Sequence, residues 1–220
     1  MPNRDYQNVR RDYDAPGLSK TQLQPSPFMQ FSQWMEEALA SPIQDATAMS
    51  LATVDKHGQP HNRIVLLKET TPEGYIFYTH YDSAKGHEIN QNQKAALLFF
   101  WPELDRQVRI EGTLSKVSKA TSQAYFESRP RDSQLAALSS MQSKEVASRK
   151  ALEETFKNNE QKYAEKTIPH PEHWGGYCLQ PNHFEFWQGR PNRLHDRFVY
   201  TPNSETHAED QAWSIQRLSP

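Results

Sequence analysis

The chain has few of the residue types that build disulfides, metal centres or glycine-rich loops. Cys178 is the only cysteine among 220 residues, which excludes an intrachain disulfide and any multi-cysteine zinc or iron–sulfur site. The histidines are scattered without the close pairing of a zinc site, so we expect no metal site. Only eight glycines are present, and the dinucleotide fingerprint, the Walker loop and the G-x-S-x-G elbow are absent. A nucleotide cofactor would therefore have to be held by side chains.

An excess of charge and a long apolar run are also missing. The 25 basic and 27 acidic side chains give a formal net charge of −2, which provides no global field for nucleic acid or an anionic membrane. No run approaches the roughly 18 apolar residues of a membrane span, and the amino terminus has no apolar signal-peptide stretch. We expect a soluble cytoplasmic protein in which any anion binding is local.

Polarity separates an amino-terminal arm from the rest of the chain. Residues 1–25 are polar, charged and interrupted by Pro16 and Pro25, which is typical of a mobile arm or of a disordered tail. Apolar residues make up only 35% of the chain, but they are clustered and 11% of all residues are aromatic. We therefore predict a single folded domain over residues 26–220.

The order of the predicted elements indicates the fold class. The stretch "SPFMQFSQWMEEALASP" predicts an amphipathic helix with Ser26 as its cap, and its apolar stripe comprises Phe28, Phe31, Trp34, Met35 and Leu39. Strands are predicted at residues 48–54, 62–69, 74–80, 95–101, 106–118, 177–189 and 193–201 and near the carboxyl terminus. Residues 119–166 are helical in composition, with an interruption at Pro130. The absence of regular βαβ alternation favours a mainly β protein with helices (α+β), an antiparallel meander that closes into a barrel.

Two local patterns could bind a phosphate. In "RIVLLK", residues 63–68, strand alternation puts Arg63 and Lys68 on opposite faces, although charges that flank a buried stretch would look the same. In "YFESRPRDS", Tyr125, Arg129 and Ser133 are spaced by four, and Pro130 can open a new helix. A helix amino terminus beside a guanidinium and two hydroxyls suits a phosphate, whereas a capping role for Arg129 is the alternative.

A third pattern is the basic stretch "NRLHDRF", residues 192–198. If it is extended, Arg193, His195 and Arg197 share one face next to an aromatic run. Such a face could hold a flat anionic ligand. The alternative is a solvated edge strand in which Asp196 neutralises a neighbour.

Six motifs, taken together, closely resemble those of the pyridoxine (pyridoxamine) 5′-phosphate oxidase family. They are, in order, "RIVLLK", "FYT", "SRPRDSQ", "WGG", "FWQG" and "RLHDR", and the resemblance runs from about Arg10 to Pro220. It implies an FMN-binding split β-barrel with FMN at a homodimer interface. It also implies oxidation of pyridoxine 5′-phosphate and pyridoxamine 5′-phosphate by O2 to pyridoxal 5′-phosphate, with release of H2O2 and, from the amine, of NH3.

The resemblance also implies which residues hold FMN. From one subunit these are Arg63, Ile64, Val65, Leu66, Leu67, Lys68, Tyr78, Thr79 and Lys85, together with Gln107. Gln142 and Ser143 are expected from the partner, and Trp187 and Arg197 complete the flavin site. One departure is Ala84, where the family usually has an arginine, and its loss could cost about 1.5–3 kcal/mol of FMN binding.

The substrate residues follow in the same way. The substrate phosphate is expected against Lys68, Tyr125, Arg129 and Ser133. Arg193 and His195 are expected at the pyridine ring, with Arg193 assisting proton removal at C4′ and His195 positioning the substrate, while Arg10 and Tyr13 of the arm close over it as a lid.

Three other functions are alternatives to the oxidase. A non-catalytic flavin- or pyridoxal-phosphate-binding split-barrel protein would lack the substrate residues, all of which are present. A reductase with another flavin or a deazaflavin would lack "RLHDR" and "SRPRDSQ", and the net charge argues against a nucleic-acid-binding barrel.

Overall fold

The computed structural model describes residues 5–8, 11–203 and 213–220. Contacts divide the chain into two compact units. The first unit comprises Met1–Thr47, Leu98–Ile110 and Asn182–Pro220, and the second comprises Ala48–Leu97 and Glu111–Pro181. The single domain over residues 26–220 stays a prediction, as does the role of residues 1–25 as a mobile lid.

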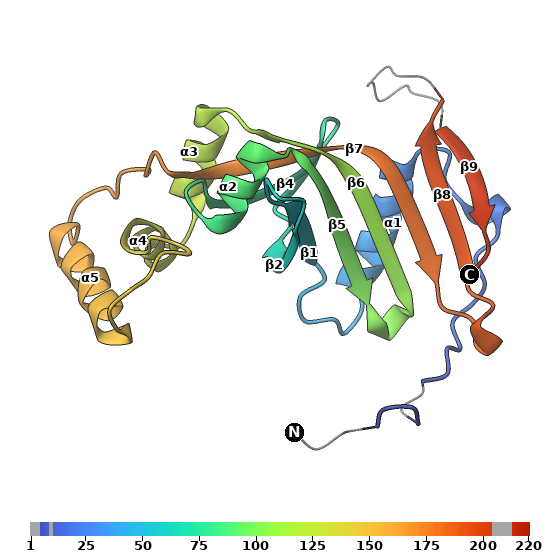
Figure 1. Ribbon diagram of the computed structural model, residues 1–220. Coiled ribbons are helices and arrows are strands. Elements are labelled where there is room, and N and C mark those ends of the chain that lie inside the picture. Colours follow the sequence, from blue (N-terminus) through green and yellow to red (C-terminus); the bar gives the residue numbers. More distant parts are fainter. Residues whose placement is uncertain (1–4, 9–10, 204–212) are drawn as a thin grey trace. The chain divides into compact units, whose positions relative to one another are not determined.

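The described residues form mostly antiparallel strands accompanied by five α-helices, in agreement with the predicted class (Figure 1). The strands are β1 (Ala48–Val54), β2 (Pro60–Leu66), β3 (Glu69–Thr71), β4 (Gly74–His80), β5 (Lys94–Trp101), β6 (Arg106–Lys116), β7 (Trp174–Gln188), β8 (Asp196–Pro202) and β9 (Trp213–Leu218). The helices are α1 (Pro27–Leu39), α2 (Ala84–Gln91), α3 (Lys119–Ser128), α4 (Arg131–Ser139) and α5 (Arg149–Lys162), with 3-10 turns η1 (Lys20–Gln22), η2 (Pro102–Leu104) and η3 (Pro191–Arg193). The strand order is β2-β1-β5-β6-β7-β4-β3, with β8 paired to β7 and β9 paired to β8. Within the described residues, no helix combines the length and the apolar character needed to cross a membrane.

In the second unit, β1 and β2 form the predicted hairpin. Their antiparallel register runs from Ala48 opposite Leu66 to Val54 opposite Pro60. The turn between them uses Gly58 at φ 83°, a conformation that favours glycine. Asp55 stabilises the turn because its carboxylate accepts hydrogen bonds from the backbone N–H groups of His57 and Gln59 at 2.8 and 3.0 Å.

The pairing of β4 with β7 explains the "WGG" motif. Tyr78 lies opposite Gly176 in this antiparallel pair. A Cβ on Gly176 would lie 2.9 Å from the Tyr78 ring and 2.8 Å from Val117. A side chain at this position would therefore displace Tyr78.

The helices of the second unit begin at local caps. Ser83 and Ser118 cap α2 and α3 by accepting hydrogen bonds from backbone N–H groups in the first turn. Helix α2 was not predicted from the sequence, whereas the break between α3 and α4 at Pro130 was. Helix α4 lies beside α5 (Figure 1), and Asn159 of α5 donates a hydrogen bond to the Ser139 hydroxyl of α4 at 2.9 Å.

In the first unit, α1 buries most of its predicted aromatic stripe. Phe31 and Trp34 are buried, and their rings lie 5.0 Å from Phe99 and 5.3 Å from Phe186. The expectation for Leu39 was wrong, since this side chain is 61% exposed at the last residue of the helix.

The predicted strand over residues 193–201 begins later than expected. Pro191 opens the turn η3, in which Asn192 and Arg193 have φ values of 57° and 60°, and β8 starts at Asp196. Left-handed residues cannot continue a strand, so the alternation that grouped Arg193, His195 and Arg197 on one strand face does not apply.

Candidate functional site

A cavity of about 430 Å³ lies in the second unit. Eleven predicted ligand-binding residues line it: Arg63, Ile64, Val65, Leu66, Lys68, Tyr78, Thr79, Lys85, Tyr125, Arg129 and Gln142. Its volume falls in the usual range of about 300–1,000 Å³ for small-molecule sites. Four of these side chains are cations, and no acidic side chain is among the described lining residues. This donor set has the chemistry of a phosphate site.

Arg63 enters the cavity from β2 and is held by buried partners. Its Nη2 lies 2.7 Å from Glu88 Oε2, and its Nη1 donates to the Leu51 carbonyl at 3.2 Å and to the Thr53 hydroxyl. Burial acts to raise the pKa of Glu88, but hydrogen bonds from Thr53 and Arg63 and the Arg63 charge outweigh it and lower the pKa below its usual value. Glu88 is therefore a carboxylate at neutral pH and orients Arg63.

Lys85 enters from the first turn of α2. Its Nζ donates to Gln142 Oε1 at 2.8 Å and to Thr79 Oγ1 at 3.3 Å, and the Thr79 hydroxyl donates to Gln142 at 3.1 Å. Burial and then the Arg63 charge lower the pKa of Lys85. Gln142 was expected from the partner subunit, but within this chain its side chain lines the cavity.

Arg129 lies at the junction of α3 and α4, over the ring of Trp174 at 4.7 Å. Its Nη1 is buried without a hydrogen-bond partner among the described residues. Burial lowers its pKa, which reflects the cost of an uncompensated charge. The next ring in the cavity wall is Tyr125, stacked on Tyr78 with centroids 3.9 Å apart. A bound oxyanion would supply the partner that Arg129 lacks.

Three predicted residues of the second unit do not line the cavity. Leu67 is only 6% exposed and belongs to the core, because β2 has already ended at Leu66 and the backbone N–H of Lys68 donates to the Ile76 carbonyl of β4. Ser133 is half-buried on the first turn of α4, and Ser143 is exposed. Helix α4 does begin next to Pro130, as predicted.

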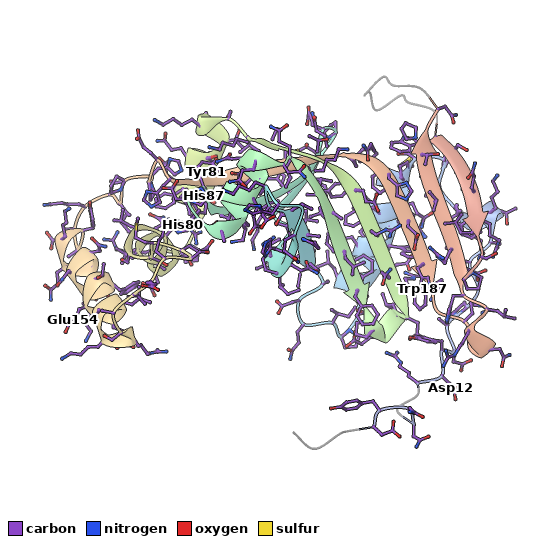
Figure 2. All side chains as sticks on the ribbon, in the orientation of Figure 1. Asp12, His80, Tyr81, His87, Glu154 and Trp187 are labelled. Atoms are coloured by element: carbon purple, nitrogen blue, oxygen red, sulfur yellow. The ribbon has the colours of Figure 1, made fainter. Side chains whose placement is uncertain are left out.

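A second cavity, of about 440 Å³, lies in the first unit. Its lining consists of Arg11, Asp12, Tyr13, Arg190, Asn192, Arg193 and His195. The Tyr13 ring meets those of Trp187 and His195 edge-on at 5.5 and 5.2 Å. Figure 2 labels Trp187 on β7 and Asp12 on the amino-terminal segment. Gly189 makes room for this packing, since a Cβ there would lie 2.6 Å from the Tyr13 ring.

The imidazole of His195 has a defined tautomer. The backbone N–H of Arg190 donates to His195 Nδ1 at 3.1 Å, so Nδ1 carries no proton. Burial and the neighbouring Arg193 charge lower the pKa of His195. At neutral pH the ring is therefore uncharged, and its Nε2–H is a hydrogen-bond donor.

Arg197 has a different environment from Arg193 and His195. Its Nη2 lies 2.9 Å from the buried carboxylate of Glu185, and its Nη1 donates to the Ser219 carbonyl at 2.8 Å. Arg197, Trp187 and Gln107 belong to the first unit, and none of them is among the described residues that line the 430 Å³ or the 440 Å³ cavity. Arg10 lies outside the described residues.

Sequence reasoning missed five residues that line the cavity in the second unit: His80, Ala136, Ala137, Ser140 and Trp174. Trp174 was within the quoted "WGG" motif but was not assigned to a ligand. His80, at the end of β4, gave no sequence signal at all, because a single histidine at a strand end is uninformative.

Comparisons with known proteins agree with these features. A family model described as "Pyridoxamine 5′-phosphate oxidase" matches residues 35–163, and one described as "Pyridoxine 5′-phosphate oxidase C-terminal dimerisation region" matches residues 174–220. The chain is 60% identical over 220 residues to "Pyridoxine/pyridoxamine 5′-phosphate oxidase 1" of Hydrogenovibrio crunogenus, with both chains fully covered. It is 46% identical over 218 residues to a pyridoxine/pyridoxamine 5′-phosphate oxidase of Nostoc sp., covering 99% of this chain and 100% of the relative.

Two solved structures share the fold. PhzG from Burkholderia lata 383, in complex with tetrahydrophenazine-1-carboxylic acid, has a TM-score of 0.86 at 24% identity and covers 96% of this chain and 100% of its own. A pyridoxamine 5′-phosphate oxidase-related, FMN-binding protein from Nostoc punctiforme has a TM-score of 0.70 at 20% identity and covers 90% of this chain and 100% of its own. The split-barrel class predicted from the sequence is confirmed.

Proposed function

Because this chain belongs to the pyridoxamine 5′-phosphate oxidase family, we propose that it oxidises pyridoxine 5′-phosphate and pyridoxamine 5′-phosphate to pyridoxal 5′-phosphate. Oxygen is the electron acceptor, H2O2 is a product, and the amine substrate also releases NH3. The observation that carries the proposal is the cation-lined cavity in which Arg129 presents a buried Nη1 that no described residue hydrogen-bonds. Both the substrate and the proposed cofactor carry a phosphate that would satisfy it.

The proposed cofactor is FMN, and the donor set of the cavity fits its phosphate. When bound, FMN supplies the acceptor for a hydride from the substrate C4′ and the route by which electrons reach O2. Arg63, Thr79 and Lys85 would hold the FMN phosphate, with Gln142 ordering Lys85. Lys68, Tyr125 and Arg129 would hold the substrate phosphate.

We propose that the protein acts as a homodimer with FMN at the subunit interface. The matched dimerisation region, residues 174–220, contains Trp187, Arg193, His195 and Arg197. Ile64 and Leu66 line the cavity of the second unit and are 67% and 40% exposed, which suits a surface that a second subunit covers.

His195 and Arg193 take separate roles at the substrate ring. The Nε2–H of neutral His195 donates a hydrogen bond and positions the ring, since its other nitrogen is occupied by the Arg190 backbone. Arg193 is exposed at the cavity lining, and a guanidinium keeps its proton. Its assistance to proton removal at the hydroxyl or amino group on C4′ is therefore electrostatic: it stabilises the negative charge that develops on that group when the proton leaves for solvent.

The cytoplasmic location predicted from the sequence is part of this proposal. Cys178 is a free, buried thiol, and burial raises its pKa to about 11. An unreactive, reduced cysteine suits a reducing compartment.

The test is an absorbance spectrum of the purified protein before and after adding pyridoxine 5′-phosphate without oxygen. The expected result is a flavin spectrum that bleaches and returns when air is admitted. A flavin spectrum that persists after substrate addition would contradict the oxidase and favour a non-catalytic flavin-binding protein. A colourless protein that reduces added FMN in the presence of the substrate would still support the oxidase function and would indicate weak FMN affinity.

A further inference from the structure

His80 is a buried histidine in the wall of the phosphate cavity for which the proposed function has no role. It ends β4, its side chain is only 5% exposed, and it lines the cavity together with Lys85 and Arg129. Figure 2 labels it near Tyr81 and His87. Its ring stacks on that of His173, with centroids 5.2 Å apart and planes inclined by 20°. The stack fixes the imidazole at the cavity wall.

The charges around His80 are predominantly positive. Lys85 faces it from α2, Arg129 from the α3–α4 junction and His173 from the segment before β7, while Asp82, in the exposed turn after β4, is the opposing carboxylate. Burial first, and then the charges of His173, Lys85 and Arg129, lower the pKa of His80 to about 4. Without a bound anion, His80 is uncharged at neutral pH.

A phosphate bound in this cavity would surround His80 with negative in place of positive charge. A dianion bound at Lys85 or at Arg129 compensates that cation and adds negative charge to the cavity that the imidazole lines. An opposite charge at short range favours the charged form of a group and raises a histidine pKa by about one to three. Because the stack on His173 holds the ring at the lining, protonation would add a charged donor directed at the anion.

We propose that His80 is a further ligand-binding residue that takes up one proton from solvent when a phosphate monoester occupies the cavity. This inference rests on the proposed function, because it requires a phosphate-bearing ligand there. The phosphate of FMN and that of the vitamin B6 substrate share the same chemistry, so the experiment below separates the two sources. The consequence is that ligand binding strengthens as the pH falls toward about 6, although free phosphate itself loses charge there.

The test is calorimetric titration of the full-length protein in two buffers of different ionisation enthalpy, which measures the protons bound with the ligand. One arm adds FMN to protein freed of flavin, with riboflavin as a control that lacks the phosphate. The other arm adds sulfate, which stays dianionic, to the FMN-loaded protein. Each arm is run with the wild type, with His80→Asn, and with His87→Asn, an exposed α2 histidine that does not line the cavity.

The expected result is net proton uptake at about pH 6 in at least one arm, present in the wild type and in His87→Asn and lost in His80→Asn. The wild-type dissociation constant in that arm should tighten about threefold more than that of His80→Asn between about pH 7.5 and pH 5.5. Proton uptake on FMN binding would show that the cofactor phosphate causes the protonation of His80. Proton uptake with sulfate alone would show that an anion at the substrate phosphate site causes it.

Equal uptake in the wild type and in His80→Asn would overturn the proposal and leave His80 as a packing residue. If His80→Asn does not fold, the wild-type titrations test the proposal by themselves, because absence of proton uptake in both arms would also overturn the proposal. Failure of the protein to bind FMN at all is a different outcome, which contradicts the proposed function itself.

Discussion

At the scale of single residues, the cations that line the cavity of the second unit differ in their partners. Arg63 is paired with Glu88, and Lys85 is hydrogen-bonded to Gln142. Arg129 lies over the Trp174 ring, and its Nη1 is buried without a hydrogen-bond partner among the described residues. A half-buried guanidinium with one buried, unsatisfied N–H group destabilises the ligand-free protein and favours anion binding.

Arg129→Met should therefore separate function from stability. We expect the KM for pyridoxine 5′-phosphate to rise about ten- to a hundredfold, because one charge-assisted contact is worth about 1.5–3 kcal/mol. The melting temperature of the flavin-free protein should stay unchanged or rise, since a half-buried cation with an unsatisfied Nη1 is removed. Steady-state kinetics and thermal unfolding measure the two effects.

Arg131 offers a matched control for this experiment. Its guanidinium donates to the carbonyls of Tyr163, Ala164 and Lys166 and does not line the cavity. Arg131→Met should lower the melting temperature and leave the KM unchanged. A large KM increase in both variants would mean that the Arg129 effect is structural.

Arg193→Lys tests the role of the guanidinium at the substrate ring. We expect kcat to fall at least about tenfold with a smaller change in KM, because an ammonium cannot reproduce the planar, delocalised charge of Arg193. Rapid-mixing measurement of flavin reduction would locate the loss in the chemical step. Full turnover with weakened affinity alone would refute the assistance to proton removal.

At the scale of elements, the β4–β7 pair positions the aromatic wall of the cavity. Gly176 leaves space for the Tyr78 ring, which stacks on Tyr125. Burial, followed by the charge of Glu69, raises the pKa of Tyr78 to about 12, so the phenol keeps its proton and can donate a hydrogen bond. A substitution at Gly176 of β7 would therefore move the Tyr78 ring, which lines the ligand cavity.

Gly176→Ala should displace that ring. The added Cβ would lie 2.8 Å from Val117 and 2.9 Å from Tyr78, and overpacking of this kind costs about 1–3 kcal/mol of folding stability. We also expect weaker FMN binding, measured by quenching of flavin fluorescence. Gly58→Ala is the control, since nothing lies within 4 Å of its Cβ and only its turn conformation is strained. Equal loss of FMN binding in the two variants would contradict the argument.

At the scale of the whole molecule, the stability of the protein depends on pH through buried histidine. The pKa of His80 is about 4 in the folded protein and about 6.5 in an unfolded chain. Between these values the unfolded state binds more protons, so stability rises with pH and is lost as the pH falls through this window. Carboxylates with lowered pKa values, such as Glu88, lose their contribution only below about pH 4.5.

The flavin-free protein should accordingly lose on the order of 2 kcal/mol of stability between about pH 6.5 and pH 4 through His80. Denaturant unfolding at several pH values measures this loss. His80→Asn should weaken the dependence above about pH 5, where the carboxylates stay ionised and do not yet titrate. An unchanged pH profile in the variant would exclude His80 as the source.

The exposed apolar residues of β2 are expected to be covered in a dimer. The protein should elute at twice the mass of one chain, and the double change Ile64→Asp with Leu66→Asp should produce a monomer that binds FMN poorly. Size-exclusion chromatography with light scattering is the measurement. A variant that stays dimeric and retains FMN would place the interface elsewhere.

The sequence by itself determined the local elements and the family. Strands β1 and β4 match the predicted ranges, and α3 ends next to Pro130 as expected, because alternation and helix breaking act over a few residues. The six motifs were sufficient for the family, since each motif is a short contiguous run.

Only the tertiary structure decided which of those residues meet in a cavity. One cavity is lined by residues that are far apart in the chain: Arg63, Lys85, Arg129 and Trp174. Local sequence propensities predict neither this proximity nor the lack of a partner for Arg129 Nη1 among the described residues. The left-handed turn at Arg193 also escaped prediction, because a strand pattern continued through it. His80 shows the same limit: its charge is set by burial and by cations from other elements, and long-range packing alone brings these together.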